Sequence, residues 1–294
     1  MSSKQLNIPP AAGIAAGVAL GAVAVGAAVA VGFQCLQLVR TKGGMARVKT
    51  VQAATGERVR VLQQGGVYQS ATYLDKRRFD PVFAYIRAFD TMFQADGVLR
   101  TMEGHGIERV LMLGGGGFSY PKHALMTRPE LSMDVVEIDP AVVRLARRWF
   151  FLDELEKLAG DRIGLIASDA RAYLAQAIVE GTRYDAIVND CFSGAAPVQS
   201  VATLEALLHI KACLRPGGIY LANVVSANGG EDIGFLRDVV ATTAAVFAHV
   251  QVVPCEDEVF GGEDNYLVIA SDVPYAFEGA LPFDEDFPGT VLRD

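Results

Sequence analysis

Three acidic residues stand at the ends of apolar runs of strand length, and a run of four glycines precedes them. These acids are Glu137, Asp169 and Asp190. Because the carboxyl ends of parallel strands meet at one edge of a sheet, carboxylates placed there can surround a single ligand. A carboxylate accepts hydrogen bonds from hydroxyl and amino groups and can take up a proton. This pattern indicates a ligand site with the means for acid-base chemistry.

The glycine run occupies positions 114–117, directly after the apolar residues 110–113. Such a turn lets the backbone pass close to a ligand, because we expect a Cβ there to fill the space that a nucleoside must occupy. Glycines also serve tight turns that bind nothing. Glu137 lies about 20 residues further on, the offset of a carboxylate that binds both ribose hydroxyls. The alternative for Glu137 is a solvated acid at a strand end.

Asp169 and Asp190 extend the pattern to two further strand ends. Asp169, followed by Ala170, is placed to accept a hydrogen bond from an adenine amino group, and it also suits the N-cap of the next helix. Asp190 ends the fourth apolar run, in a position that faces a ligand. Asp139, which precedes Pro140, is better explained as a helix N-cap. Three carboxylates beside a glycine loop therefore predict a nucleoside site.

Apolar runs of strand length alternate with segments of helical length from residue 109 onward. The predicted strands are 110–113, 135–138, 163–167, 186–188, 219–225, 250–253 and 266–270, and the predicted helices are 140–150, 170–178, 204–214 and 233–247. Apolar strands that alternate with helices indicate a mainly parallel sheet covered on both faces. No helix separates the last two strands, so an antiparallel hairpin should close one edge. We predict an α/β fold with a seven-stranded, mostly parallel sheet.

Composition and motifs exclude several classes of protein. The net charge of −8 leaves no surplus of Lys and Arg to neutralise phosphates, so we expect no nucleic-acid partner. No Gly-Lys-Ser/Thr follows the glycine loop, which excludes a P-loop, and Ser119 replaces the third glycine of a dinucleotide-binding loop. The four cysteines and four histidines lack metal-ligand spacing, so we expect reduced thiols and no metal site.

A hairpin and a helix are expected before the glycine loop. Residues 58–62 and 67–73 read as strands, and Gly65 and Gly66 supply the positive φ that the turn between them needs. A helix is predicted to begin near Asp80. Its apolar stripe, which we assign to core packing, is formed by Phe83, Ile86, Phe89 and Phe93.

Residues 11–33 form an almost unbroken run of Ala, Val, Gly, Ile and Leu, and no charged residue lies between Lys4 and Arg40. About 20 apolar residues cross a bilayer as a helix. The stronger basic flank, at 40–49, follows the run and places the rest of the chain in the cytoplasm. We therefore expect a single-pass helix in the inner (cytoplasmic) membrane, with a flexible Ala/Gly-rich leader as the alternative. Small residues at four-residue spacing would let two such helices pack as a homodimer.

These features divide the chain into four segments. We expect a transmembrane anchor at 1–40 and a basic linker, β-hairpin and helix at 41–100. A nucleoside-binding domain should occupy 101–275, and a C-terminal tail 276–294.

Several motifs together resemble those of spermidine synthase-like proteins, which are aminopropyltransferases on the Rossmann-like class I methyltransferase fold. The motifs are Leu-Gly-Gly-Gly-Gly at 113–117, Val-Glu-Ile-Asp-Pro at 136–140, Ser-Asp-Ala at 168–170, Tyr-Asp-Ala-Ile-Val-Asn-Asp at 184–190 and Leu-Arg-Pro-Gly-Gly at 214–218. The hairpin at 66–75 resembles that family's N-terminal β-domain. The hairpin is the more specific part, because class I methyltransferases share the other motifs.

The resemblance implies S-adenosylmethionine or decarboxylated S-adenosylmethionine as the cofactor. It implies that Glu137 binds ribose, that Asp169 binds the adenine amino group, and that Gln69 lines the pocket. Asp190 matches the first Asp of the family's catalytic motif and, with Tyr68 to position the substrate, is a candidate catalytic residue. The predicted cofactor-binding residues are Gln69, Gly114, Gly115, Gly116, Glu137, Asp169, Ala170 and Asp190.

Two positions depart from the family pattern. Gly117 stands where spermidine synthases usually carry an Asp that holds the aminopropyl amine, and Ser193 stands where they carry a second catalytic Asp. A polyamine is mostly ammonium at pH 7, so transfer needs a carboxylate that holds the cation and takes its proton. Serine does neither well, and loss of a positioned base typically lowers the rate about 10²–10⁴-fold. In this chain Asp190 would have to take that role.

Three functions are therefore considered. The first is spermidine synthase-like aminopropyl transfer to a small-molecule amine, as in polyamine biosynthesis. The second is methyl transfer from S-adenosylmethionine, whose carboxylate would be repelled by the Asp that is missing here. The third is a non-catalytic, membrane-anchored nucleoside-binding protein.

Overall fold

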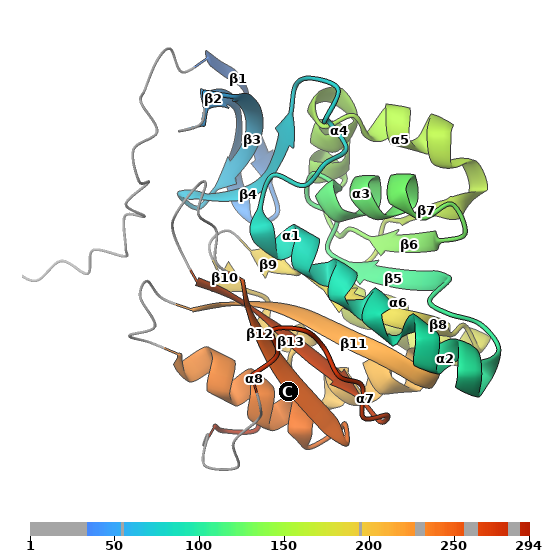
Figure 1. Cartoon of the computed structure of the whole chain (residues 1–294). Helices are drawn as coiled ribbons and strands as arrows, with labels where there is room; N and C mark the ends of the chain where they lie inside the picture. The colour runs from blue at the N-terminus through green and yellow to red at the C-terminus, as the bar shows by residue number, and fades with distance from the viewer. Residues whose placement is uncertain (1–33, 54–55, 194–195, 227–232, 256–263, 282–288) are drawn as a thin grey trace, which may run out of the picture.

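The fold is built on a seven-stranded sheet of order β12-β13-β11-β8-β5-β6-β7 (Figure 1). The computed structural model describes residues 34–53, 56–193, 196–226, 233–255, 264–281 and 289–294. The strands are β5 (Arg109–Leu113), β6 (Ser132–Val136), β7 (Ile163–Ile166), β8 (Tyr184–Asn189), β11 (Leu214–Ser226), β12 (His249–Cys255) and β13 (Asp264–Ser271). Six of them run in the same direction, and β13 alone is reversed, because it pairs antiparallel with both β11 and β12. The predicted mostly parallel sheet with a hairpin at one edge is confirmed.

Helices cover both faces of this sheet, because its strands are apolar on both sides. Along β5, Val110 and Met112 enter one buried cluster, whereas Leu111 and Leu113 enter the other. The first cluster lies under α1 (Ala84–Ala88), η1 (Phe89–Ala95), α2 (Asp96–Glu103), α3 (Ser119–Thr127), α4 (Pro140–Trp149) and α5 (Leu152–Ala159). The short η2 (Gly160–Arg162) follows α5 and leads into β7. The second lies under η3 (Gln199–Val201), α6 (Ala170–Glu180), α7 (Leu204–Cys213) and α8 (Gly234–Ala244). Two short strands, β9 (Phe192–Ser193) and β10 (Ala196–Pro197), pair beyond β8.

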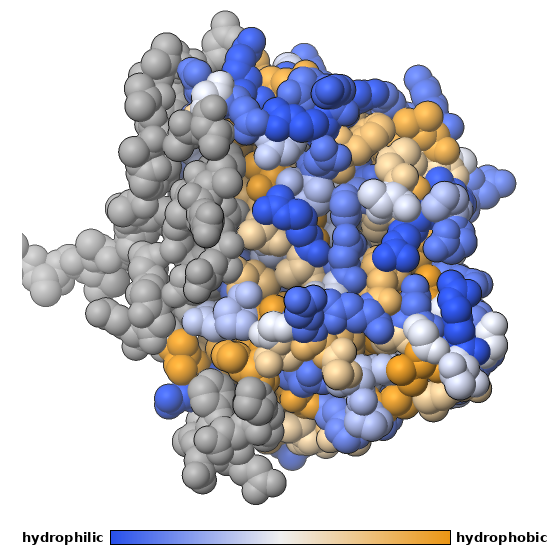
Figure 2. Space-filling model, viewed as in Figure 1, coloured by the Kyte–Doolittle hydropathy of each residue, from blue (hydrophilic) through white to orange (hydrophobic). Residues whose placement is uncertain are grey.

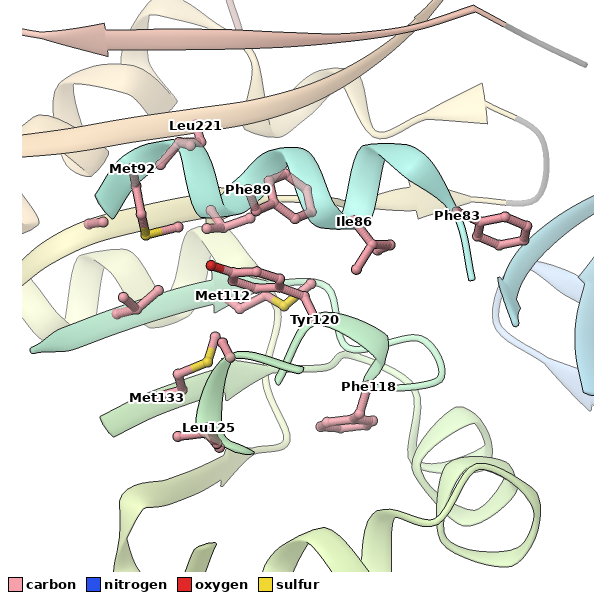
Figure 3. Packing of buried hydrophobic residues seen from close by; sticks show 14 of the residues in the cluster. Phe83, Ile86, Phe89, Met92, Met112, Phe118, Tyr120, Leu125, Met133 and Leu221 are labelled. Atoms are coloured by element: carbon pink, nitrogen blue, oxygen red, sulfur yellow. The ribbon is translucent and has the colours of Figure 1, made fainter. Parts of the chain in front are cut away.

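The apolar stripe predicted before the glycine loop packs into the first cluster, as Figure 3 shows. Phe83, Ile86, Phe89 and Phe93 are all less than a tenth exposed. The ring of Phe89 meets Tyr120 of α3 edge to face, with centroids 5.1 Å apart. The assignment of this stripe to core packing is therefore confirmed.

A separate four-stranded antiparallel sheet precedes these helices. Its strands, in spatial order, are β1 (Gln34–Thr41), β2 (Gly44–Gln52), β3 (Arg58–Gln64) and β4 (Val67–Tyr73). The predicted hairpin is β3–β4, and Gly65 and Gly66 have φ values of +60° and +92° at its turn. The basic stretch expected to be a linker forms β1 and β2 instead. Its apolar residues alternate with the basic ones. Among them, Val48 packs in one cluster with Leu145 of α4 and with Phe150 at the end of that helix.

The prediction of a single-pass inner-membrane protein is wrong by the structure. Within the described ranges, no helix combines the length and the apolar character needed to cross a membrane. The predicted span at 11–33 itself lies outside the described residues. The basic flank that set the orientation belongs to the strands of the small sheet.

The visible surface mixes hydrophilic and hydrophobic side chains over most elements (Figure 2). The large apolar side chains that are half exposed, such as Leu38, Met102 and Leu208, come from different elements. Single exposed apolar residues of this kind are ordinary on the surfaces of globular proteins.

Candidate functional site

Glu137 is the centre of the hydrogen bonds at the carboxyl ends of the strands. It follows β6 and is 9% exposed. Its Oε2 accepts the amide N–H groups of Gly115 (3.0 Å) and Gly116 (3.1 Å), and its Oε1 accepts that of Asp139 (2.8 Å). Burial raises the pKa of Glu137, and these amides oppose the increase. A carboxylate has about four acceptor positions, so one remains for a ligand hydroxyl rather than the two that we expected.

The first two glycines of the loop are required by the protein's own packing. Gly114 has φ +94°, and a Cβ there would lie 2.4 Å from the backbone oxygen of Asp190. A Cβ on Gly115 would lie 2.9 Å from Cζ of Phe118. The expectation that a Cβ in this turn would fill the nucleoside's space is corrected, because both Cβ directions point at protein atoms.

The other two glycines face strand β4. A Cβ on Gly116 would lie 2.9 Å from Oγ of Ser70. A Cβ on Gly117 would lie 2.7 Å from Cβ of Ser70 and 3.1 Å from Cδ1 of Phe150. Ser70 also accepts the amide N–H of Gly117 at 2.8 Å. A serine and a phenylalanine therefore occupy the direction that an Asp side chain at position 117 would take.

Replacing Gly114 with Ala is expected to lower the free energy of unfolding by about 2–4 kcal/mol, because it combines positive-φ strain with a backbone collision. Gly181→Ala is the matched control, since Gly181 also has positive φ (+71°) but no atom within 4 Å of its Cβ position. Urea unfolding of both variants measures the difference. Equal losses would show that the contact with Asp190 is unimportant.

Asp190 forms a partly buried pair with Asn223 of β11. Asn223 Nδ2 donates to Asp190 Oδ1 at 2.9 Å. Burial raises the pKa of Asp190 to about 6, although this hydrogen bond opposes the increase. Asn223 is 8% exposed, and its Oδ1 has no hydrogen-bond partner among the described residues. A buried acceptor without a donor is costly, so this oxygen is suited to an N–H group of a ligand.

Asp169 caps helix α6, and its exposed side chain accepts the amide N–H of Ala172 at 3.1 Å. Ala170 begins that helix and is buried. The N-cap role considered for Asp169 is therefore present, and the carboxylate remains accessible for further donors. Asp139 caps α4 in the same way, through the amide of Ala141.

The charges of the three predicted carboxylates all act on one group, the thiol of Cys191. Burial raises the pKa of its thiol most, and the charges of Asp190, Glu137 and Asp169 raise it further. Because Coulomb interactions fall with distance, three charges that act on one thiol must lie around one region of the strand ends. That Glu137, Asp169 and Asp190 surround one ligand stays a prediction.

Strand β4 joins the small sheet to the glycine loop. Beside the Ser70–Gly117 bond, Ser119 Oγ donates to the backbone oxygen of Ala71 at 3.2 Å. Tyr68 and Gln69 directly precede Ser70 on this strand, and the backbone oxygen of Gln69 lies 3.9 Å from the Cβ position of Gly116. Their roles in ligand binding stay predictions. Burial raises the pKa of Tyr68, so its phenol is neutral at physiological pH and suits positioning rather than proton abstraction.

Sequence reasoning missed Asn223, Ser70 and Cys191. Asn223 interrupts an otherwise apolar strand, and such a polar interruption at a strand end is a usable signal. Ser70 and Cys191 carried no signal, because their importance arises from contacts made across the fold. Ser193 lies in β9, and its side chain is outside what the structure describes.

Comparison with known proteins shows which family this chain resembles. A family model described as the Spermine/spermidine synthase domain matches residues 93–253, more than half of the chain. The chain is 35% identical over 121 residues to a polyamine aminopropyltransferase of Vibrio vulnificus. That match covers 41% of this chain and 39% of the relative, so the chain spans about two fifths of its length.

Solved structures share the fold. A probable spermidine synthase from Corynebacterium glutamicum superimposes with a TM-score of 0.62 at 23% identity, covering 82% of this chain and 81% of the other. Human methyltransferase-like protein 13, solved in complex with SAH, gives a TM-score of 0.54 at 23% identity, covering 69% and 86%. The α/β methyltransferase-type fold expected from the sequence is thereby confirmed.

Proposed function

The chain belongs to the spermine/spermidine synthase family, and on that premise we propose that it transfers an aminopropyl group from decarboxylated S-adenosylmethionine to a small-molecule amine. The observation that carries this proposal is the Asp190–Asn223 pair. It offers a carboxylate with a pKa of about 6 and a buried carbonyl oxygen without a donor. Two adjacent acceptors at the strand ends are complementary to an amine.

The cofactor's adenosyl part fits the remaining groups of the site. Glu137 keeps one acceptor position for a ribose hydroxyl after its three amide bonds. Asp169 keeps an exposed carboxylate beside the start of α6 for the adenine amino group. Human methyltransferase-like protein 13, which shares the fold, was solved with SAH, and this supports an S-adenosylmethionine-type ligand.

Asp190 would act as the base. Bound at this edge, the sulfonium cofactor supplies the electrophilic carbon and the leaving group. Asp190 takes one proton from the substrate ammonium, while Asn223 Oδ1 accepts a second N–H and holds the nitrogen in place. The nitrogen then forms the N–C bond as the C–S bond breaks, and methylthioadenosine leaves. The product nitrogen stays protonated, and Asp190 passes its proton to solvent.

Methyl transfer from intact S-adenosylmethionine is the second candidate, and one observation favours it. Ser70 and Phe150 occupy the direction of a side chain at Gly117, so the loop has no carboxylate there to hold an aminopropyl amine or to repel the methionine carboxylate.

Product analysis distinguishes the two. The full chain is incubated with a diamine and either decarboxylated or intact S-adenosylmethionine, and products are identified by mass spectrometry. We expect an aminopropylated diamine and methylthioadenosine from the decarboxylated form. A methylated product from the intact form, with no aminopropyl transfer, would replace the proposal by methyl transfer.

The pH dependence of transfer follows from Asp190. Because its pKa is about 6, the carboxylate is mostly protonated at pH 5 and mostly ionised at pH 7. The rate at saturating substrates should therefore rise about tenfold per pH unit below 6 and level above it. A pH–rate profile measures this, and a flat profile between pH 5 and 7 would contradict the assignment of the base.

A further inference from the structure

A C-terminal strap, residues 289–294, lies along helices α8 and α7. The amide of Thr290 donates to Asp238 Oδ1 at 2.6 Å, and the amide of Leu292 donates to Thr242 Oγ1 at 2.9 Å. The backbone oxygen of Leu292 accepts the amide of Leu204 at 2.8 Å. The strap is thus fixed by backbone bonds to both helices, and its path is defined.

The strap ends on Arg171, the second residue of α6. Both guanidinium NH groups of Arg171 donate to the two carboxylate oxygens of Asp294 at 2.8 Å. The same guanidinium donates to the backbone oxygen of Ser200 (2.8 Å) and to Thr203 Oγ1 (3.2 Å). Thr203 in turn donates to Asp294 Oδ1 at 2.7 Å. These bonds raise the pKa of Arg171 and lower that of Asp294, so both stay charged at neutral pH.

Arg171 therefore joins two segments that lie beside predicted ligand residues. One is the start of α6, which Asp169 caps. The other is residues 198–203 of the segment that follows Asp190, which ends at Thr203, the N-cap of α7. It is tied to the residue after Asp190, because the amide of Val198 donates to the backbone oxygen of Cys191 at 3.0 Å. A bidentate Arg–carboxylate pair fixes direction as well as distance, which a single point charge does not.

We propose that Asp294, acting through Arg171, is a positioning residue that sets the spacing between the adenine-side carboxylate Asp169 and the segment carrying Asp190. This rests on the proposed function, because Asp169 and Asp190 are ligand residues only if an adenosyl cofactor binds there. Asp294 itself contacts neither segment's ligand-facing carboxylate.

The test compares full-length Asp294→Asn with wild type in two measurements. In hydrogen exchange without ligand, the amides at 170–172 and 199–203 should exchange faster in the variant. In calorimetry, methylthioadenosine should bind about fivefold more weakly, the upper range for a partly exposed ion pair. Asp294→Glu, which keeps the carboxylate, should recover part of the affinity.

Glu156→Gln is the matched control, since Glu156 forms a bidentate pair with Arg147 that joins α4 to α5. It should leave both measurements unchanged. If Asp294→Asn lowers only the melting temperature, which is the effect that we expect of this control, the positioning role is overturned. If wild type binds no methylthioadenosine, the proposed function fails, and the exchange measurement alone decides whether Asp294 holds the two segments.

Discussion

Replacing Asp190 with Asn is expected to lower the rate of aminopropyl transfer at saturating substrates by about 10²–10⁴-fold, the usual effect of losing a positioned base. The amide keeps an oxygen that can accept the hydrogen bond from Asn223, so the shape of the site is retained. It cannot take a proton. Steady-state kinetics at pH 7.5 measures the loss, and activity within threefold of wild type would exclude Asp190 as the base.

The same variant carries its own folding control. Burial holds the pKa of Asp190 at about 6, above the ordinary value of 3.8, so the folded chain binds this proton more tightly than the unfolded chain does. Asp190 therefore reduces stability as the pH rises from about 4 to 6, and Asn avoids this loss. At pH 7.5, Asp190→Asn should be more stable than wild type by about 3 kcal/mol in urea unfolding, and at pH 4 about equal. A lower stability at pH 7.5 would show that the substitution disturbs the fold.

Replacing Glu137 with Gln is expected to weaken methylthioadenosine binding at least about tenfold. A hydrogen bond to a charged acceptor contributes about 1.5–3 kcal/mol, and 1.4 kcal/mol is a factor of ten in affinity. The new NH₂ group would also face an amide N–H of Gly115, Gly116 or Asp139. Stability should fall as well, so affinity by calorimetry and unfolding by urea are both needed.

Asp185→Asn separates these two effects. Asp185 is also a buried carboxylate that accepts two backbone amides, those of Glu108 and Arg109, but it lies where β8 and β5 begin. We expect it to lower stability while leaving the affinity for methylthioadenosine unchanged. If both variants lose affinity in proportion to stability, Glu137 has no direct contact with the ligand.

The parallel core could be predicted because its strands are apolar on both faces and its helices carry clear start signals. Asp139 and Asp169 both cap helices, and each cap accepts an amide of the first turn. Helix α3 was not predicted, because its sequence lacks such a start signal and an apolar pattern. It contains Pro121 and buries Lys122, which is 2% exposed and donates to Thr72 Oγ1 and to the backbone oxygen of Phe150. Burial lowers the pKa of this lysine to about 7. A hydropathy pattern predicts that a lysine is exposed, so it gives no sign of this buried helix.

From the sequence, the candidate site could be predicted only for residues that lie at the carboxyl ends of strands. Glu137, Asp169 and Asp190 each end a strand, and topology brings strand ends together without any knowledge of packing. The purpose of the glycines could not be derived in this way. A Cβ on Gly115 would collide with Phe118, and a Cβ on Gly116 or Gly117 would collide with Ser70. Ser70 comes from the separate N-terminal sheet. Contacts between parts that are distant in sequence leave no local pattern.

The central claim is that an adenosyl group binds at the strand ends around Glu137, and calorimetric titration tests it most directly. The full chain is titrated with methylthioadenosine, decarboxylated S-adenosylmethionine and S-adenosylmethionine. We predict saturable binding of methylthioadenosine and tighter binding of the decarboxylated than of the intact cofactor. Glu137→Gln should reduce the affinities for methylthioadenosine and for the decarboxylated cofactor. A folded chain that binds none of the three would contradict the claim.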